Sequence, residues 1–185
     1  MTIAEELRAI VVEVVLVEDG FVAHPDDRGG PTKYGVTQKT LGSYRGRPVT
    51  REEVEALTVD EAIRIYELRY VVDPGFDKLA EISLRVAAEV VDTGVNMGVG
   101  TAGVFLQRAL NALNARGELY PDLVVDGRCG SATRAALTSY LAHRNESALV
   151  KALNCLQGAR YVELCEARER NESFLYGWLQ NRVRL

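Results

Sequence analysis

The sequence lacks the excess of basic residues that nucleic-acid-binding proteins use. Its 185 residues carry 22 lysines and arginines against 26 aspartates and glutamates, for a net charge of −4. No basic stripe that would neutralise a phosphate backbone stands out along the chain. We therefore expect no nucleic-acid partner.

Cysteines at metal-binding or redox spacing are also missing. The three cysteines, Cys129, Cys155 and Cys165, contain no CxxC pair, and an odd number does not suit a disulfide framework. We expect free thiols. The segment that holds His24 and Asp27 does not have the spacing of a calcium-binding loop. We therefore expect no metal and no cofactor.

Long apolar runs are scarce. The most apolar stretch, Ala9–Val17, is about half of a membrane span and contains Glu13. Residues 1–8 carry two glutamates where a secretory signal needs basic residues. We expect no stable membrane span and synthesis in the cytoplasm without a signal peptide. If the protein acts outside the membrane, another component must release it.

Strand-like alternation is rare, whereas helical periodicity is common. Apolar residues at spacings of three and four predict helices over 3–18 and 79–95. Thr50 and Glu53 fit a capping box at the start of a further helix. The fold class is therefore mainly α, with a small β-hairpin or irregular lobe at residues 19–37. The short strand candidates are Phe21–Ala23, Gly35–Thr37 and Leu123–Val125.

Three residues in the turn-rich lobe suit the hydrolysis of a glycosidic bond. Glu18 ends an apolar helix, where the helix dipole and dry surroundings raise a carboxyl pKa, as a general acid requires. Asp27 follows nine positions later, and Thr32 adds a hydroxyl that could hold a water beside it. The same residues also fit a plain helix end and a surface turn, so residue chemistry alone leaves both interpretations open.

The stretch EDGFVAHPDDRGGPTKYGVT also resembles the active-site motif of the lysozyme-like muramidases of glycoside hydrolase family 108. Phage endolysins and bacterial proteins once called secretion activators contain this motif. Farther along, DTGVNMGVGTAGVFLQRALNAL and VVDGRCGSATRAAL resemble the family's C-terminal peptidoglycan-binding region. Asp19 and His24 depart from the usual motif. The matching motif residues are Glu18, Gly20, Phe21, Pro25, Asp27, Gly29, Gly30, Thr32, Tyr34, Gly35 and Thr37.

The resemblance implies a lysozyme-like fold with the active site in the lobe at 19–37. It implies a catalytic region at 1–94 and a helical peptidoglycan-binding region at 95–185, and we expect the two to share one core. The implied enzyme is an endolysin-type N-acetylmuramidase, a glycoside hydrolase that cuts the β-1,4 bond between N-acetylmuramic acid and N-acetylglucosamine in peptidoglycan. The implied partners are peptidoglycan glycan strands and a holin or other export partner, and we expect a monomer that acts on the cell wall in the periplasm.

The resemblance also assigns roles to individual residues. Glu18 would protonate the leaving oxygen. Asp27 with Thr32 would hold or activate the attacking water, or else Asp27 would stabilise the oxocarbenium-like charge. Tyr34 would form a wall of the sugar groove, or else pack in the core. Asn96 and Gln107 would bind sugar amides, with capping or packing at a glycine-rich joint as the alternative.

Two other functions remain open for the same sequence. A lytic transglycosylase would use the same glutamate on the same polymer without a water-holding aspartate, and would leave anhydro-sugar ends. A non-catalytic wall-binding or structural phage protein would not need Glu18 at all. The presence of Glu18, Asp27 and Thr32 together favours the muramidase.

Overall fold

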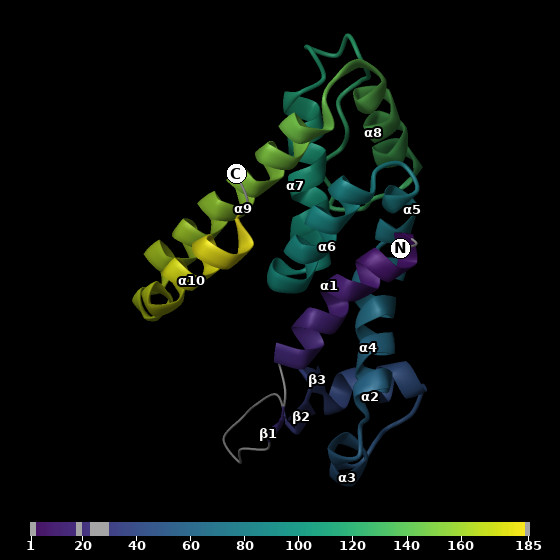
Figure 1. Ribbon diagram of the computed structural model, residues 1–185, viewed down its shortest axis with the longest axis vertical. Coiled ribbons are helices and arrows are strands. Elements are labelled where there is room, and N and C mark those ends of the chain that lie inside the picture. Colours follow the sequence, from purple (N-terminus) through teal and green to yellow (C-terminus); the bar gives the residue numbers. More distant parts are fainter. Residues whose placement is uncertain (1–2, 18–19, 23–29, 184–185) are drawn as a thin grey trace. The chain divides into compact units, whose positions relative to one another are not determined.

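The computed structural model describes residues 3–17, 20–22 and 30–183. The backbone divides into two compact units, Met1–Asp73 and Pro74–Leu185. Both are mainly helical (Figure 1), which confirms the predicted fold class. The first unit consists of α1 (Ile3–Val17), β1 (Phe21–Val22), β2 (Thr32–Lys33), β3 (Val36–Thr37), α2 (Gln38–Arg45), α3 (Arg51–Glu55), α4 (Val59–Glu67) and the π-helix η1 (Leu68–Val72).

Helix α1 forms where the apolar periodicity predicted it. Its buried side chains are those of Leu7, Val11, Val14 and Val15. The helix packs against α4 (Figure 1). Valine lowers helix propensity slightly, but full burial of such a side chain is worth about 1.5–3 kcal/mol. Tertiary packing therefore holds this valine-rich helix together.

The small lobe contains a three-stranded antiparallel sheet in the order β1-β2-β3. The central strand places Thr32 opposite Val22 on one side and Thr37 on the other. Strand β2 is not among the predicted strands. Conversely, the predicted strand Leu123–Val125 lies in a loop. The predicted β-lobe is thus confirmed, with a different set of strands.

Charged and capping contacts join the three helices that follow the sheet. The predicted capping box is present, because Glu53 N donates to Thr50 Oγ1 at 3.3 Å and Thr50 N donates to Glu53 Oε2 at 3.0 Å. Arg45 at the end of α2 donates to Glu53 on α3 and to both carboxylate oxygens of Glu61 on α4. Hydrogen bonds from Arg47 and from the backbone of Thr50 lower the pKa of Glu53 to about 2.

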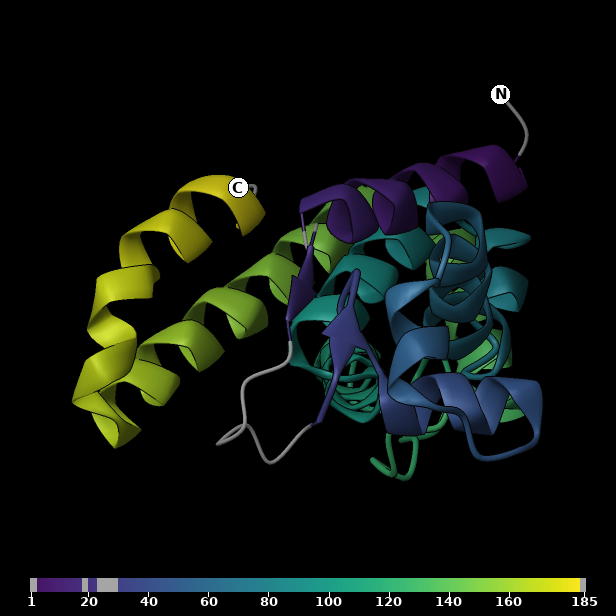
Figure 2. The same cartoon turned by 90° about the horizontal axis from the view of Figure 1, so that it is seen from below.

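The second unit is built around α6, α7 and α9, which pack against one another. Helix α10 folds back beside α9 (Figure 2). In the described part of the chain, no helix combines the length and apolarity that a membrane crossing needs. The elements of this unit are α5 (Phe76–Ala80), α6 (Leu84–Met97), α7 (Val99–Ala112), α8 (Ser131–His143), α9 (Glu146–Ala167), the 3-10 helix η2 (Glu169–Asn171) and α10 (Glu172–Arg182).

The single helix predicted over 79–95 is wrong, because the chain breaks between α5 and α6. Ser83 caps α6 by accepting a hydrogen bond from Val86 N at 3.0 Å, and its hydroxyl donates to Glu146 Oε1 on α9 at 2.6 Å. The buried face of α6 includes Val86, Ala87, Val90 and Val91. Backbone contacts group α5 and α6 with the later helices, and the division into 1–94 and 95–185 stays a prediction.

Candidate active site

The two predicted carboxylates, Glu18 and Asp27, lie outside the described residues, as do Asp19 and His24. Their roles and their separation therefore stay predictions. The structure does describe the elements on either side of them, namely α1, which ends at Val17, and the sheet that resumes at β2. These elements form the scaffold of the candidate site.

Thr32 occupies the central strand of the sheet and is partly buried. Its hydroxyl donates to the carbonyl oxygen of Gly30 at 3.3 Å, which is long for a hydrogen bond between oxygens. Gly30 has a φ of 71°, in the left-handed region that glycine favours. The weak contact leaves the hydroxyl able to serve either as a brace for this turn or as a partner for a water.

Tyr34 stands in the turn between β2 and β3, in a conformation that is costly for its residue type. The turn has only two residues between the paired Lys33 and Val36, and both have positive φ, 52° at Tyr34 and 69° at Gly35. This is the pattern of a type I′ turn, in which asparagine or glycine is usual at the first position. The Lys33 ammonium lies 5.3 Å from the centre of the Tyr34 ring. Strain of this kind is a recurrent feature of ligand sites, so the groove-wall role of Tyr34 stays a prediction with a physical motive.

The end of the sheet is fixed to the start of α2. Thr37 caps α2 by accepting a hydrogen bond from Thr40 N at 3.2 Å, and the two hydroxyls share a hydrogen bond of 3.0 Å. Arg69 on η1 donates to Thr40 Oγ1 at 2.9 Å. Gln38 adds a second anchor, because its side chain donates to Val49 O at 2.7 Å. The strand that pairs with Thr32 is therefore tied to two neighbouring helical elements.

Gln107, the second predicted sugar-amide contact, is buried within the second unit. Its side chain lies on α7 in the second unit, and the residue is only 2% exposed. The amide oxygen accepts a hydrogen bond from Gly127 N at 2.8 Å, and the amide nitrogen donates to Asp126 Oδ1 at 2.9 Å and to Arg128 O at 3.1 Å. The bond from Gln107 lowers the pKa of Asp126. Sugar binding by Gln107 stays a prediction, and its position favours the alternative, a structural role at the loop before α8.

Asn96 lies near the end of α6, in the second unit, and is exposed. Its side-chain nitrogen donates to Asp92 O, one turn back, at 2.7 Å. This local bond occupies one donor of the Asn96 amide group. Sugar binding by Asn96 stays a prediction. Thr32 and Tyr34 thus belong to the first unit, whereas Asn96 and Gln107 belong to the second.

The three cysteines are free, as expected. Burial raises the pKa of the Cys129 thiol to about 12, so this thiol stays protonated and has little nucleophilic character. Among the described residues, no cluster of three or more histidine, cysteine, aspartate or glutamate side chains could hold a metal ion.

A pocket of about 440 Å³ in the first unit has no counterpart in the sequence predictions. We call it the α2–η1 pocket, since α2 forms one wall and the end of α4 with η1 forms the other. Its two walls bring together side chains 21 to 34 positions apart in the sequence, from Tyr44 and Ile65 to Lys39 and Asp73, which no local pattern indicates. The polar, charged and large apolar side chains of this lining include Lys39, Thr40, Tyr44, Leu68, Arg69 and Asp73.

Comparison with known proteins assigns a class to this scaffold. Residues 11–98 match the family model described as Glycosyl hydrolase 108, and these residues enclose Glu18, Asp27, Thr32 and Tyr34. Residues 11–98 are therefore a glycosyl hydrolase domain. More particularly, the chain consists of a glycosyl hydrolase 108 domain followed, at residues 101–183, by a domain that matches the family described as Predicted Peptidoglycan domain.

A solved structure agrees with this assignment over almost the whole chain. The structure of Brucella abortus SagA superposes with a TM-score of 0.66 at 25% identity, covering 96% of this chain and 89% of that one. No curated protein matches the chain. The fold is thus the mainly helical, lysozyme-like fold that the motif implied.

Proposed function

We propose that the protein is an N-acetylmuramidase that hydrolyses the β-1,4 bond between N-acetylmuramic acid and N-acetylglucosamine in peptidoglycan. The observation that carries the proposal is the glycosyl hydrolase 108 match, which encloses Glu18, Asp27 and Thr32 and is followed by a predicted peptidoglycan domain. A glycosidase joined to a domain for this polymer is suited to cutting the polymer itself.

The proposed chemistry uses two carboxyl groups. Glu18 protonates the glycosidic oxygen as the sugar leaves, and Asp27 activates the water that attacks the anomeric carbon. Thr32 holds that water beside Asp27. A residue that holds water is useful where water attacks directly, so we favour inversion, which requires the two carboxyl groups to stand roughly 6.5–9.5 Å apart.

The direct test is to digest purified peptidoglycan and identify the new ends. New reducing ends at muramic acid support the muramidase. Anhydromuramic ends would instead identify a lytic transglycosylase, and the absence of new ends would favour the non-catalytic wall-binding protein.

The variant Glu18→Gln tests the acid, because it preserves shape and removes the proton. We expect a loss of about 10²–10⁴-fold in lysis of outer-membrane-stripped cells, with an unchanged melting temperature. Glu13→Gln is the matched control, since Glu13 is exposed on α1 and undergoes the same chemical change. Equal activity of both variants would contradict the mechanism.

The water-holding pair has its own test. Asp27→Asn is expected to cost most of the rate and Thr32→Ala less. The double variant should lose less than the sum of the two in free energy, because the residues act as one unit. If Thr32 only braces the turn through Gly30, Thr32→Ala will lower the melting temperature while folded enzyme keeps its rate.

We further propose that the enzyme acts as an endolysin. In this role it is made in the cytoplasm, works as a monomer, and reaches the wall in the periplasm through a holin or a comparable export partner. Expression alone should leave cells intact with activity confined to lysates, and co-expression with a holin should cause lysis. Spontaneous lysis without a partner would refute this part of the proposal.

A further inference from the structure

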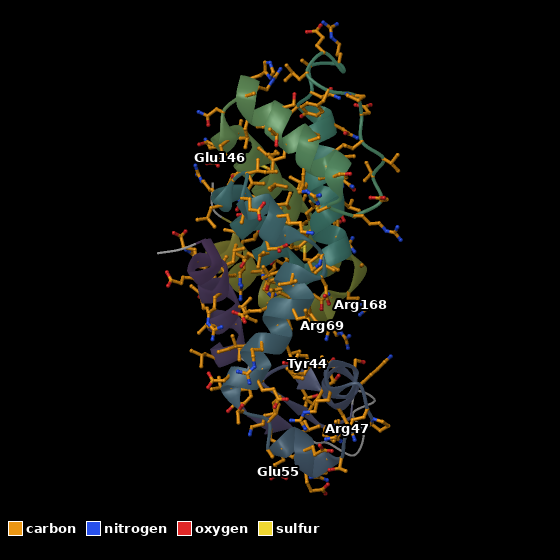
Figure 3. The ribbon with its side chains drawn as sticks, turned by 90° about the vertical axis from the view of Figure 1, so that its right-hand side faces the viewer. Tyr44, Arg47, Glu55, Arg69, Glu146 and Arg168 are labelled. Atoms are coloured by element: carbon orange, nitrogen blue, oxygen red, sulfur yellow. The ribbon has the colours of Figure 1, made fainter. Side chains whose placement is uncertain are left out.

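The α2–η1 pocket combines an aromatic wall with positive charge. Tyr44 on α2 and Leu68 on η1 are each 38% exposed at the pocket, while Ile65 beneath them is 1% exposed. Figure 3 shows Tyr44 and Arg69 close together, on the two walls. The pocket therefore offers apolar surface for a ring or an alkyl group beside a cationic edge.

Among the described residues, no ion pair neutralises the positive charge at the pocket. In the part of the chain that the structure describes, neither Lys39 nor Arg69 takes part in a salt bridge. Arg69 donates one bond, to the neutral hydroxyl of Thr40, and a guanidinium has five N–H donors. One carboxylate, Asp73, also lines the pocket, so the lining keeps a net positive charge.

The wall that carries Arg69 has an unusual backbone. Residues Leu68–Val72 form a π-helix, closed by a hydrogen bond of 2.8 Å from Asp73 N to Leu68 O. Such single turns are rare and frequently occur at functional sites. The extra residue in this turn changes the phase of the helix, which sets the directions in which Leu68 and Arg69 project.

The pocket is physically connected to the predicted active site. Arg69 bonds Thr40, Thr40 shares a hydrogen bond with Thr37, and Thr37 pairs across the sheet with Thr32. A ligand that reaches the pocket would thus sit one helical turn from the strand next to Thr32.

We propose that the α2–η1 pocket binds a carboxylate carried by the muramyl substituent of peptidoglycan. The inference rests on the proposed function. Lys39 and Arg69 attract the anion, and the planar guanidinium suits a carboxylate. Tyr44 and Leu68 cover the apolar atoms next to it. Two sources supply this carboxylate, the peptide stem of intact peptidoglycan and the lactyl group of strands from which an amidase has removed the stem.

The test compares hydrolysis of intact peptidoglycan with hydrolysis of the same material after its carboxylates have been converted to amides. We expect amidation to lower kcat/KM of the natural enzyme by about three- to tenfold, the range for exposed charge-assisted contacts. Arg69→Gln should be much less sensitive to amidation, and Arg69→Lys should retain most of the sensitivity. Arg64→Gln is the matched control on α4, because Arg64 is exposed and does not line the pocket.

Amidase-stripped strands identify the source of the carboxylate. If Arg69→Gln impairs cleavage of intact peptidoglycan but not of stripped strands, the stem supplies it. If it impairs cleavage of stripped strands alone, the lactyl group does, and if it impairs both, the pocket accepts either carboxylate. If Arg69→Gln and Arg64→Gln respond equally to amidation, the proposal is overturned.

A binding measurement separates failure of the pocket from failure of the proposed function. Calorimetry with a soluble muramyl peptide and with its amidated form does not depend on hydrolysis. We expect tighter binding of the charged form, weakened by Arg69→Gln and by salt. Equal binding of both forms would refute the pocket even if the enzyme cuts peptidoglycan. Selective binding without any cutting would refute the muramidase and leave the pocket standing.

Discussion

Replacing Gln107 by leucine would decide between the structural role of this residue and its predicted contact with sugar. The two side chains are similar in volume, so the change removes polar atoms and creates little empty space. In the structure it deprives Gly127 N of its acceptor at 2.8 Å and Asp126 Oδ1 of a donor at 2.9 Å. Asp126 still accepts a bond from Arg128 N, so the Gly127 N–H carries most of the cost.

The size of the loss follows from these contacts. An N–H left without a partner in a partly buried position costs about 1–3 kcal/mol, and the bond to the exposed Asp126 adds little because solvent screens it. Burying an apolar leucine side chain in place of the amide offsets part of this free-energy cost. We expect a net loss of about 2 kcal/mol, equivalent to a fall of about 1 M in the urea midpoint or about 4–8 °C in melting temperature.

The assay is urea unfolding followed by circular dichroism, with a peptidoglycan pull-down on the same preparations. Arg108→Gln is the control, since Arg108 is the exposed neighbour on α7 and its replacement should change stability by less than about 0.5 kcal/mol. A Gln107→Leu protein with an unchanged midpoint and weakened pull-down would refute the structural role of Gln107 and support the sugar-binding prediction.

The backbone and the charges lead to three further predictions. Gly103→Ala should destabilise by at least about 2 kcal/mol in urea unfolding, because its Cβ would lie 2.1 Å from the carbonyl oxygen of Gly127, whereas Gly100→Ala, with open space on the same helix, should be neutral or slightly stabilising. Tyr34→Asn should be more stable than Tyr34→Ala by about 0.5–1 kcal/mol, since both remove the ring but asparagine tolerates positive φ; equal midpoints would argue against strain. The lowered pKa of Glu53 means that its carboxylate stabilises the fold above its unfolded pKa of 4.5, and that this contribution disappears as pH falls toward about 2. The gap in midpoint between natural protein and Glu53→Gln should therefore close between pH 4.5 and pH 2, and a constant gap would contradict the assignment.

Features fixed by neighbours in sequence were predictable, as two helix starts illustrate. Thr50 and Glu53 form the capping box that their spacing of three indicates, because both partners lie in one turn. Ser83 also begins a helix, yet it stands in an apolar stretch without glycine or proline to mark a break. Its hydroxyl is oriented in part by Glu146, 63 positions away, and no local pattern carries that information.

The same distinction applies to the candidate site. The motif from Glu18 to Thr37 is compact in sequence, so the sequence alone is enough to propose its residues. The α2–η1 pocket depends on Arg69 reaching Thr40 across 29 positions and on a π-turn that has no sequence pattern of its own. The role of Gln107 could not be decided from the sequence, because a polar residue among apolar ones on a helix suits a binding site as well as a buried structural contact.

The packing of α6 has a consequence for domain recombination in proteins of this architecture. The hydrolase family match ends at residue 98 and therefore includes α6, yet two of the helices that pack against α6, namely α7 and α9, lie almost entirely in the wall-binding match, and only α5 belongs with α6 to the hydrolase match. A chimera joined at residues 98–101 would present Val86, Val90 and Val91 to a foreign surface. A chimera joined at Asp73–Pro74 would carry α5 and α6 along with their own partners. Recombination that replaces the wall-binding half is therefore expected to take the last two helices of the hydrolase match with it.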